Sequence, residues 1–302
     1  MLNQFIEEFT RNHWGTLLES EPLAKHTTFR VGGPAKVMVI PSSKESLIHT
    51  MKLINKLDIP WKVIGKGSNL LPSDHEFDGV VVKCDKELAQ VEVNGTVMTV
   101  GSGVSTILLA RQAARLGLSG LEFISGVPGT VGGAIYMNAG AYKMEMKDIL
   151  IRALILDHEG ELRWLENEEF EFSYRTSILQ QHKDWLVVEA ELRLMPADRE
   201  EILELMDSRR QRRKESQPLE MPSAGSTFRN PLPHASWKLI EDAGLRGYTI
   251  GGAQVSEKHC NFIVNIGNAT SQNILDLIGH VQAVVKETYD IDLHPEVEMF
   301  NW

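Results

Sequence analysis

Three short segments of the sequence place a polar side chain of possible chemical use in a predicted turn. The segments are Ser173–Ser177, Ala224–Pro231 and Leu293–Val297, and their candidate reactive residues are Arg175, Ser226 and Glu296. An arginine, a hydroxyl and a carboxylic acid could together donate a proton and stabilise a developing negative charge. Each also has a purely structural interpretation, since Ser226 could cap a turn, Arg175 could pair with a surface carboxylate and Glu296 could be an exposed charge at a strand end.

Two glycine-rich loops could bind an anion through the backbone. The first, Gly65-Lys66-Gly67-Ser68-Asn69, follows a predicted strand, and the second runs from Gly126 to Ala134. Glycine lets backbone amides approach an anion closely, and amides from two such turns can surround a pyrophosphate. Leu70 stands where a dinucleotide fingerprint has its third glycine, which disfavours a Rossmann enzyme. A series of tight turns at a sheet edge is the alternative interpretation of the second loop.

The composition excludes several classes of protein. The net charge is −10, so we expect no general affinity for nucleic acid or for anionic membranes. The first residues lack a signal-peptide pattern and the longest apolar runs are only strand-sized, which predicts a cytoplasmic protein without membrane insertion. Cys84 and Cys260 lack metal-ligand spacing, so we expect free thiols and no metal site. The sequence carries no signal for an oligomeric state.

The elements that would position the two glycine loops alternate between strands and helices. The predicted strands of the first half are 36–40, 61–64, 79–83, 91–93 and 97–100, and the predicted helices are 44–57 and 105–116. Asn94-Gly95 predicts a two-residue hairpin turn between the last two of these strands. The stretch from Gly117 to Tyr142 suits neither a regular helix nor a regular strand.

The second half continues with a hairpin and then becomes more helical. The predicted elements are strands 149–156, 161–164, 185–194, 253–255 and 262–265 and helices 199–214, 236–243 and 271–289. The turn of the hairpin is predicted at His158-Glu159-Gly160. The charged end of the helix over 199–214 precedes Pro218 and Pro222, so we expect a domain boundary near residue 205.

The order and spacing of several motifs resemble one enzyme family. The segment His26–Ala35, the turn Gly65–Asn69 and the stretch Gly126–Tyr142 resemble the FAD-binding half of the UDP-N-acetylenolpyruvoylglucosamine reductase family, a branch of the vanillyl-alcohol-oxidase-like flavoproteins. The resemblance extends from about Leu23 to Glu296. It implies an α+β fold, with a two-part FAD-binding region of the vanillyl-alcohol-oxidase/PCMH type in subdomains 1–84 and 85–204 and a C-terminal α+β substrate-binding domain, 205–302.

The resemblance also implies the reaction and its residues. The family reduces UDP-N-acetylglucosamine enolpyruvate, using non-covalent FAD that NADPH has reduced. Ser226 would donate the proton to the carbon next to the substrate carboxylate, and Arg175 and Glu296 would polarise that carboxylate. Tyr174, Asn230 and Arg246 match positions near the substrate. The residues expected to bind FAD are Gly65, Lys66, Gly67, Ser68, Asn69, Gly126, Val127, Pro128, Gly129, Thr130, Gly132, Gly133, Ala134, Asn138 and Gly140.

Alternatives remain at the level of subclass and reaction. The short span between Arg175 and Trp185 resembles the shorter subclass, which lacks an extra tyrosine-bearing loop over the substrate. A flavin oxidase of the same broad fold would need a base where this chain offers a proton donor, and a non-catalytic nucleotide-binding module would not need Arg175, Ser226 and Glu296 together. The basic run Arg209–Lys214 could attract NADPH or the UDP group, or it could be a solvated helix face.

Overall fold

The computed structural model describes residues 1–157 and 159–302, and the contacts within the chain divide it into two compact units. The first unit contains Met1–Glu19, Lys36–Lys66 and Asp78–Arg210, and the second contains Ser20–Ala35, Gly67–Phe77 and Gln211–Trp302. The limits 1–84, 85–204 and 205–302 stay a prediction. The expected boundary near residue 205 lies inside helix α5, Arg199–Ser216, which is continuous across it.

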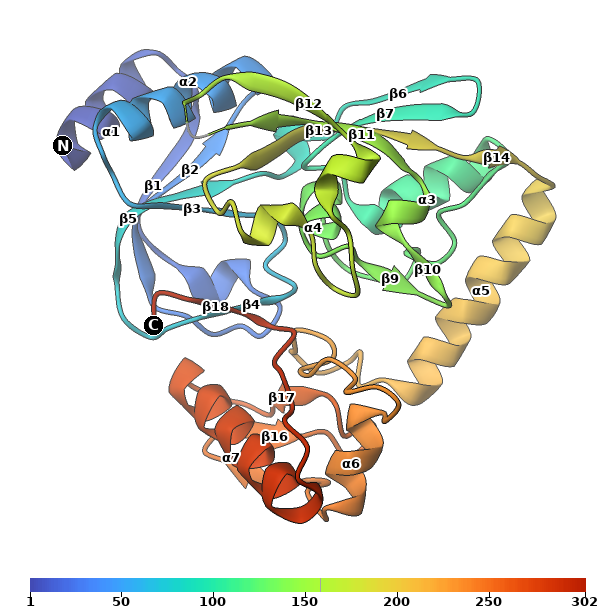
Figure 1. Ribbon diagram of the computed structural model, residues 1–302. Coiled ribbons are helices and arrows are strands. Elements are labelled where there is room, and N and C mark those ends of the chain that lie inside the picture. The colour runs from blue at the N-terminus through green and yellow to red at the C-terminus, as the bar shows by residue number, and fades with distance from the viewer. Residues whose placement is uncertain (158) are drawn as a thin grey trace. The chain divides into compact units, whose positions relative to one another are not determined.

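The first unit begins with a four-stranded sheet in the order β1-β2-β5-β3. Its strands are β1 Gly15–Pro22, β2 Pro34–Pro41, β3 Trp61–Ile64 and β5 Phe77–Lys83, and its helices are α1 Leu2–Arg11 and α2 Lys44–Lys56 (Figure 1). Phe5 and Phe9 of α1 and Leu47 of α2 are fully buried in one cluster with Val37 and Val80 of the sheet. Burial of these apolar faces therefore attaches both helices to the sheet.

A five-stranded antiparallel sheet forms the rest of this unit's framework, in the order β12-β11-β13-β7-β6. The strands are β6 Val91–Asn94, β7 Val97–Gly101, β11 Leu150–Leu156, β12 Leu162–Glu166 and β13 Leu186–Arg193. Strands β6 and β7 form the predicted hairpin, but Asn94 pairs with Val97, so the two turn residues are Gly95 and Thr96 and not Asn94 and Gly95. Both faces of β13 are buried, because Leu186 and Val188 contact one core while Val187 and Ala190 contact another.

Two helices cover one face of this sheet. They are α3, Thr106–Arg115, and α4, Val131–Tyr136, and Figure 1 shows both on the same side of β7 and β13. Helix α4 corrects the prediction that the stretch from Gly117 to Tyr142 contains no regular helix. Its two glycines lower the helical propensity, but the side chain of Thr130 caps it and buried Val131 and Ile135 attach it to the core.

Short elements complete the first unit. The remaining strands are β8 Leu118–Ser119, β9 Gly140–Ala141, β10 Met144–Glu145 and β14 Met195–Pro196. Four 3-10 helices are Lys86–Leu88, Met146–Asp148, Asn167–Phe170 and Ile178–Gln180.

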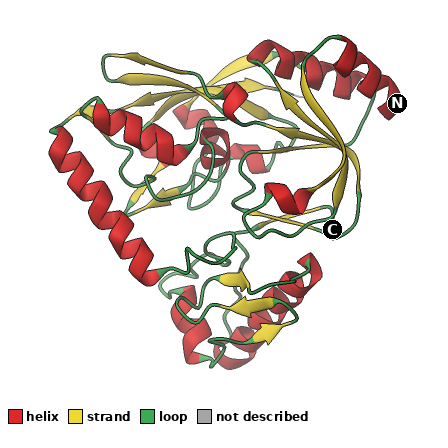
Figure 2. Ribbon diagram, turned by 180° about the vertical axis from the view of Figure 1, so that it is seen from behind, coloured by secondary structure: helices red, strands yellow, loops and turns green. Residues whose placement is uncertain are grey.

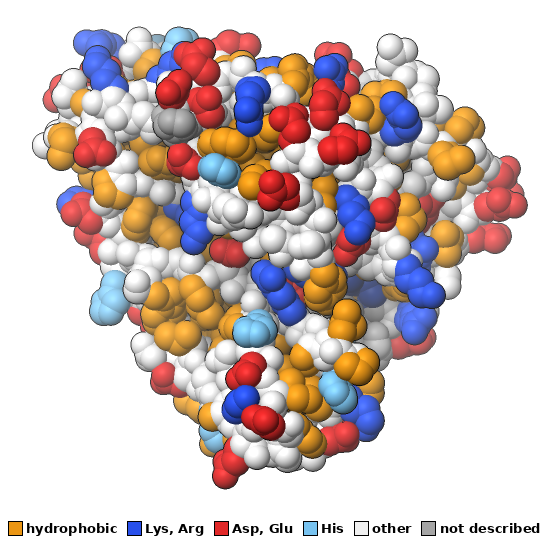
Figure 3. Space-filling view, in the orientation of Figure 1, with side chains coloured by type: hydrophobic (Ala, Val, Ile, Leu, Met, Phe, Trp, Pro, Cys, Tyr) orange, Lys and Arg blue, Asp and Glu red, His pale blue; other side chains and the backbone are white. Residues whose placement is uncertain are grey.

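Helix α5 has acidic residues in its first turn, Glu200 and Glu201, and basic residues in its last, Arg213 and Lys214. Figure 3 shows this order along the right-hand side of the view, where red side chains give way to blue ones below them. The arrangement complements the helix dipole, since anions are favoured at the N-terminus and cations at the C-terminus. The helix dipole thus gives a structural reason for part of the basic run Arg209–Lys214.

The second unit has its own core and its own elements (Figure 2). These are the 3-10 helix Leu23–His26, strands β4 Leu70–Pro72, β15 Thr249–Ile250, β16 Ala253–Val255, β17 Ile263–Asn265 and β18 Glu298–Phe300, and helices α6 Ser236–Asp242 and α7 Ser271–Tyr289. Strands β15, β16 and β17 form one antiparallel sheet, and β4 pairs with β18 in parallel. Fully buried Leu277 and Val281 of α7 belong to the same core as Ala253 and Val255.

The structure also bears on the predicted elements, the cysteines and the expected absence of membrane insertion. The predicted helices and the longer predicted strands are confirmed to within a few residues, and the hairpin turn is confirmed apart from His158, which lies outside the described residues. Both cysteines are free and buried, and burial raises the pKa of the Cys84 thiol to about 12. None of the helices in the described ranges has the length and apolar character needed to cross a membrane.

Candidate active site

The two glycine loops meet in the first unit, at the end of β3. A side chain at Gly65 would place its Cβ 2.4 Å from the Oγ1 atom of Thr130, closer than any real contact. Gly65 therefore has to be a glycine where the loops touch. The side chain of Lys66, the next residue, extends to Asp85, with 3.5 Å between Nζ and Oδ1.

Backbone hydrogen bonds hold the Gly126–Ala134 loop against the segment that follows β7. The amide of Val131 donates to Val104 at 2.9 Å, and that of Gly132 donates to Ser102 at 2.9 Å. The hydroxyl of Thr106 donates to the carbonyl of Val127 at 2.6 Å. The loop that was predicted from glycine content alone is thus a fixed structure at the N-terminus of α4.

The second half of the first glycine turn belongs to the second unit and reaches a different residue. Gly67 has φ of +60°, and a Cβ atom there would lie 2.1 Å from the carbonyl oxygen of His26. The side-chain amide of Asn69 donates to the carbonyl of Glu296 at 3.0 Å, and the amide of Glu298 donates to the carbonyl of Asn69 at 3.0 Å. Asn69 is therefore adjacent to a predicted catalytic residue.

The chain segments of Ser226 and Glu296 lie side by side in the second unit. The amide of Glu296 donates to the carbonyl of Thr227 at 2.8 Å, and the amide of Arg229 donates to His294 at 2.9 Å. Ser226 also forms a bridge with Phe262 on its other side. Backbone pairing thus brings together two predicted catalytic residues that are 70 positions apart in the sequence.

Asn261 fixes the segment that carries Ser226. Its side-chain oxygen accepts from the amide of Phe228 at 3.0 Å, and its side-chain nitrogen donates to the carbonyl of Phe228 at 2.9 Å. Its own amide donates to Nδ1 of His259 at 3.2 Å, which fixes the unprotonated side of that ring. Burial lowers the pKa of His259 below its ordinary value. The sequence analysis did not select either residue, because neither lies in a glycine loop or a recognised motif.

Arg175 stands at the end of a two-residue turn in the first unit. Ser173 and Thr176 exchange backbone hydrogen bonds of 3.1 Å, so Tyr174 and Arg175 form the turn. Arg175 has φ of +58°, a conformation that a long side chain rarely adopts. Such strain persists only where surrounding contacts impose it. Here the side chain of Gln180 donates to the carbonyl of Arg175 at 3.0 Å.

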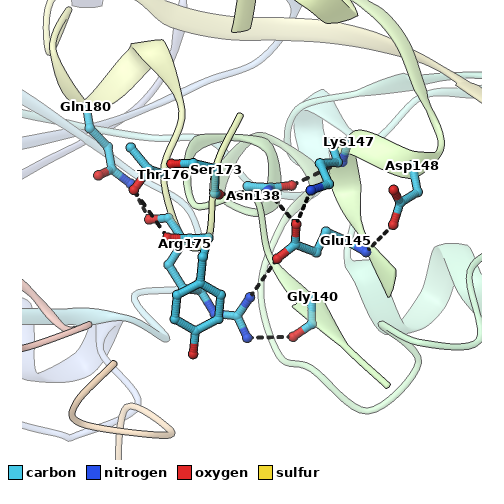
Figure 4. A network of polar contacts seen from close by, with 10 residues as sticks. Asn138, Gly140, Glu145, Lys147, Asp148, Ser173, Arg175, Thr176 and Gln180 are labelled. Carbon is cyan, nitrogen blue, oxygen red and sulfur yellow. Dashed lines mark hydrogen bonds and ion pairs between the residues drawn. The ribbon is translucent and has the colours of Figure 1, made fainter. Parts of the chain in front are cut away.

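A polar network surrounds the guanidinium of Arg175 (Figure 4). Its Nη2 donates to the carbonyl of Gly140 at 2.7 Å, and its Nη1 lies 3.9 Å from Oε1 of Glu145. The guanidinium carbon lies 4.9 Å from the centre of the Tyr174 ring. Glu145 was missed by the sequence analysis, because it lies three residues beyond the glycine-rich stretch that ends at Tyr142.

Asn138, predicted to bind the cofactor, is fully buried below this network. Its side-chain nitrogen donates to Glu145 at 3.0 Å and to the carbonyl of Ser173 at 2.9 Å, and its oxygen accepts from the amide of Lys147 at 3.1 Å. Asn138 thus connects the turn that carries Arg175 to the residue that pairs with it.

The remaining substrate candidates, Asn230 and Arg246, have partners within the second unit. The side-chain oxygen of Asn230 accepts from the amide of Ser236 at 3.0 Å, at the start of α6. The guanidinium of Arg246 binds the carboxylate of Glu241 and the carbonyl of Glu257. The hydrogen bond to Glu241 raises the pKa of Arg246, so this residue stays a cation.

The structure therefore collects the predicted residues into three groups, two in the first unit and one in the second. The first unit brings together Gly65, Thr130 and the rest of the second glycine loop, and separately Tyr174, Arg175 and Gly140. The second unit brings together Asn69, Ser226 and Glu296. Asn230 follows Arg229 at the end of the segment that begins at Ser226, and Arg246 contacts a separate cluster around Glu241.

Comparisons with known families match two regions of the chain. Residues 35–166 match the family model of an FAD binding domain, and residues 217–300 match that of the C-terminal domain of UDP-N-acetylenolpyruvoylglucosamine reductase. The first region includes both glycine loops and Gly140, whereas Tyr174 and Arg175 lie between the two regions. The second region includes Ser226 and Glu296.

Individual relatives match over nearly the whole chain. The UDP-N-acetylenolpyruvoylglucosamine reductase of Bacillus subtilis is 49% identical, and that of Anoxybacillus flavithermus is 47% identical, each over 99% of both chains. The crystal structure of the reductase from Thermus caldophilus covers 95% of this chain and 98% of its own, with a TM-score of 0.81 and 35% identity. The resemblance predicted from the motifs is confirmed, and the chain belongs to the UDP-N-acetylenolpyruvoylglucosamine reductase family.

Proposed function

We propose that this protein uses NADPH and FAD to reduce UDP-N-acetylglucosamine enolpyruvate to UDP-N-acetylmuramate, a step in the synthesis of peptidoglycan precursors. The observation that carries the proposal is 49% identity to a reductase of this name over 99% of both chains. That range contains every candidate segment from Gly65 to Glu296. Because the substrates are small soluble molecules, we expect the reaction to take place in the cytoplasm.

The glycine loops of the first unit fit the diphosphate of FAD. Gly65 leaves no room for a side chain beside Thr130, and a Cβ at Gly132 would lie 3.0 Å from that of Ser102, so the backbone of both loops is bare. Bare backbone lets loops of this kind approach a diphosphate closely. The residues proposed to hold FAD are Gly65, Lys66, Gly67, Ser68, Asn69, Gly126, Val127, Pro128, Gly129, Thr130, Gly132, Gly133, Ala134, Asn138 and Gly140.

Bound FAD would supply a hydride from its N5 atom after reduction by NADPH. Ser226 would donate a proton to the carbon next to the substrate carboxylate, which completes the saturation of the double bond. Arg175 and Glu296 would polarise the carboxylate and stabilise the negative charge that develops on it. The close pairing of the segments that carry Ser226 and Glu296 supports a shared role for these two residues.

Three further residues are proposed to bind the substrate. Tyr174 is about two-fifths exposed, with its ring beside the guanidinium of Arg175, so part of it is accessible to a ligand. The side-chain oxygen of Asn230 accepts a hydrogen bond from the amide of Ser236 at the start of α6. This hydrogen bond also fixes the orientation of the side-chain nitrogen of Asn230. Arg246 is exposed but paired with Glu241, so a substrate phosphate would have to compete with that carboxylate.

A reductive titration tests the proposal. The purified protein should show flavin absorbance that NADPH bleaches under anaerobic conditions and that UDP-N-acetylglucosamine enolpyruvate restores. UDP-N-acetylglucosamine, which lacks the enolpyruvyl group, is the matched control and should not restore the absorbance. Bleaching that the enolpyruvyl substrate fails to reverse would reject the assignment.

A further inference from the structure

The strand pair β9–β10 brings Glu145 to Arg175. The register places Glu145 directly opposite Gly140, and Tyr142 and Lys143 form the connecting turn with φ of +55° and +66°. Two non-glycine residues in this conformation are unusual, and a primed two-residue turn of this kind fixes the register of its hairpin. The position of Glu145 is therefore set by the backbone.

Gly140 gives the side chain of Glu145 room to cross the strand pair. A Cβ atom at Gly140 would lie 2.7 Å from Cγ of Glu145 and 2.5 Å from the carbonyl oxygen of Met144. The carbonyl of Gly140 in turn accepts from Nη2 of Arg175 at 2.7 Å. Gly140 thus has two functions in the network, since it admits Glu145 and anchors the guanidinium that Glu145 faces (Figure 4).

The two carboxylate oxygens of Glu145 have different partners. Oε2 accepts from Asn138 at 3.0 Å and lies 3.0 Å from Nζ of Lys147. Oε1 lies 3.9 Å from Nη1 of Arg175, beyond hydrogen-bond length. The short contacts with Asn138 and Lys147 fix the carboxylate in place, whereas its contact with Arg175 is a longer ion pair. An incoming carboxylate could therefore bind Arg175 without first breaking a short ion pair to Glu145.

We propose that Glu145 is a positioning residue for Arg175, which it holds toward a substrate carboxylate through a long-range ion pair. The proposal rests on the proposed function, in which Arg175 binds the carboxylate of the substrate. Only about 17% of the Arg175 side chain and 18% of the Glu145 side chain is exposed, so water screens their attraction less than at an open surface. The hydrogen bond to Gly140 and the ion pair with Glu145 together direct the guanidinium.

The test measures how strongly the holoenzyme distinguishes a ligand with a carboxylate from one without it. The dissociation constants of UDP-N-acetylmuramate and UDP-N-acetylglucosamine are measured by calorimetry for the wild type, Glu145→Ala, Glu145→Gln and Arg175→Met. Glu92→Ala, on the exposed strand β6, is the control. Glu145→Ala should reduce the preference for the carboxylate ligand by about tenfold, the size of one charge-assisted interaction.

Glu145→Gln keeps the volume and removes the charge, so its preference should fall in the same direction if charge positions Arg175. Bound FAD and the melting temperature should stay near wild type in this isosteric variant. An unchanged preference in both Glu145 variants, beside a reduced one in Arg175→Met, would overturn the inference and leave the proposed function intact. An unchanged preference in Arg175→Met would instead remove the carboxylate role of Arg175 from the proposed function.

Discussion

Arg175 and Ser226 are held in position in different ways. In the first unit, a network of side chains fixes Arg175, with buried Asn138 at its centre and Glu145 beside the guanidinium. In the second unit, backbone pairing aligns the segment of Ser226 with that of Glu296, and Asn261 adds a clamp. A side-chain network changes with one substitution, whereas backbone pairing survives most substitutions. We therefore expect single substitutions to disturb the position of Arg175 more than that of Ser226.

The largest effect on stability is expected from Asn138→Ala in the first unit. It removes three hydrogen bonds from a fully buried position and places alanine at φ of +41°. Because buried polar groups left without partners are costly, the free energy of unfolding should fall by about 3 kcal/mol, as measured in urea. Asn138→Gly relieves the backbone strain and should recover less than half of that loss. Full recovery in the glycine variant would show that strain, not the network, dominates.

A smaller loss is expected from Asn261→Ala in the second unit. The substitution leaves the amide and carbonyl of buried Phe228 without the side-chain partners that they now have. The free energy of unfolding should fall by about 2 kcal/mol in the same urea assay. Backbone pairing with residues 294–296 remains, so product formation should suffer less than it does in Asn138→Ala. Exposed Asn94→Ala is the control, and a catalytic loss equal to that of Asn138→Ala would contradict the comparison.

The smallest effect is a pH dependence that originates in the second unit. Burial lowers the pKa of His259, and the charge of Arg246 lowers it further while Glu241 opposes this. A lowered pKa means that the unfolded chain binds the proton more tightly, so His259 favours folding above its ordinary pKa of 6.5 and this contribution is lost as the pH falls below that value. Protonation would also remove the acceptor for the Asn261 amide.

Urea unfolding at a series of pH values measures this contribution. The wild type should lose more stability than His259→Gln as the pH falls from neutral, and both should respond alike above neutral pH. Parallel curves over the whole range would show that His259 contributes nothing to the acid response.

The fold was largely predictable because its main elements follow local patterns. Asn94-Gly95 between alternating strands specifies a hairpin, and apolar spacing specifies α2, α3 and α7. Helix α4 was missed because Gly132 and Gly133 disfavour a helix by propensity, whereas the Thr130 cap and core contacts stabilise it. Tertiary contacts of this kind have no local signature.

The candidate site was predictable only where glycine and motif order mark it. Gly65 and the second loop were selected for their glycines, and the structure brings them together. Glu145 could not be found in this way, because its approach to Arg175 depends on the positive φ of Tyr142 and Lys143, which their residue types do not favour. Asn261 lies 33 residues from Phe228, so its hydrogen bonds to that residue depend on tertiary structure alone.

The proposed role of Ser226 as proton donor can be tested directly with Ser226→Ala in rapid-mixing experiments on the two half-reactions. We predict that reduction of the flavin by NADPH keeps its wild-type rate, because it needs no proton from Ser226. Reoxidation by UDP-N-acetylglucosamine enolpyruvate should slow by about 100-fold or more, as expected when a general acid is removed. Equal slowing of both half-reactions would contradict the account and make Ser226 a structural residue.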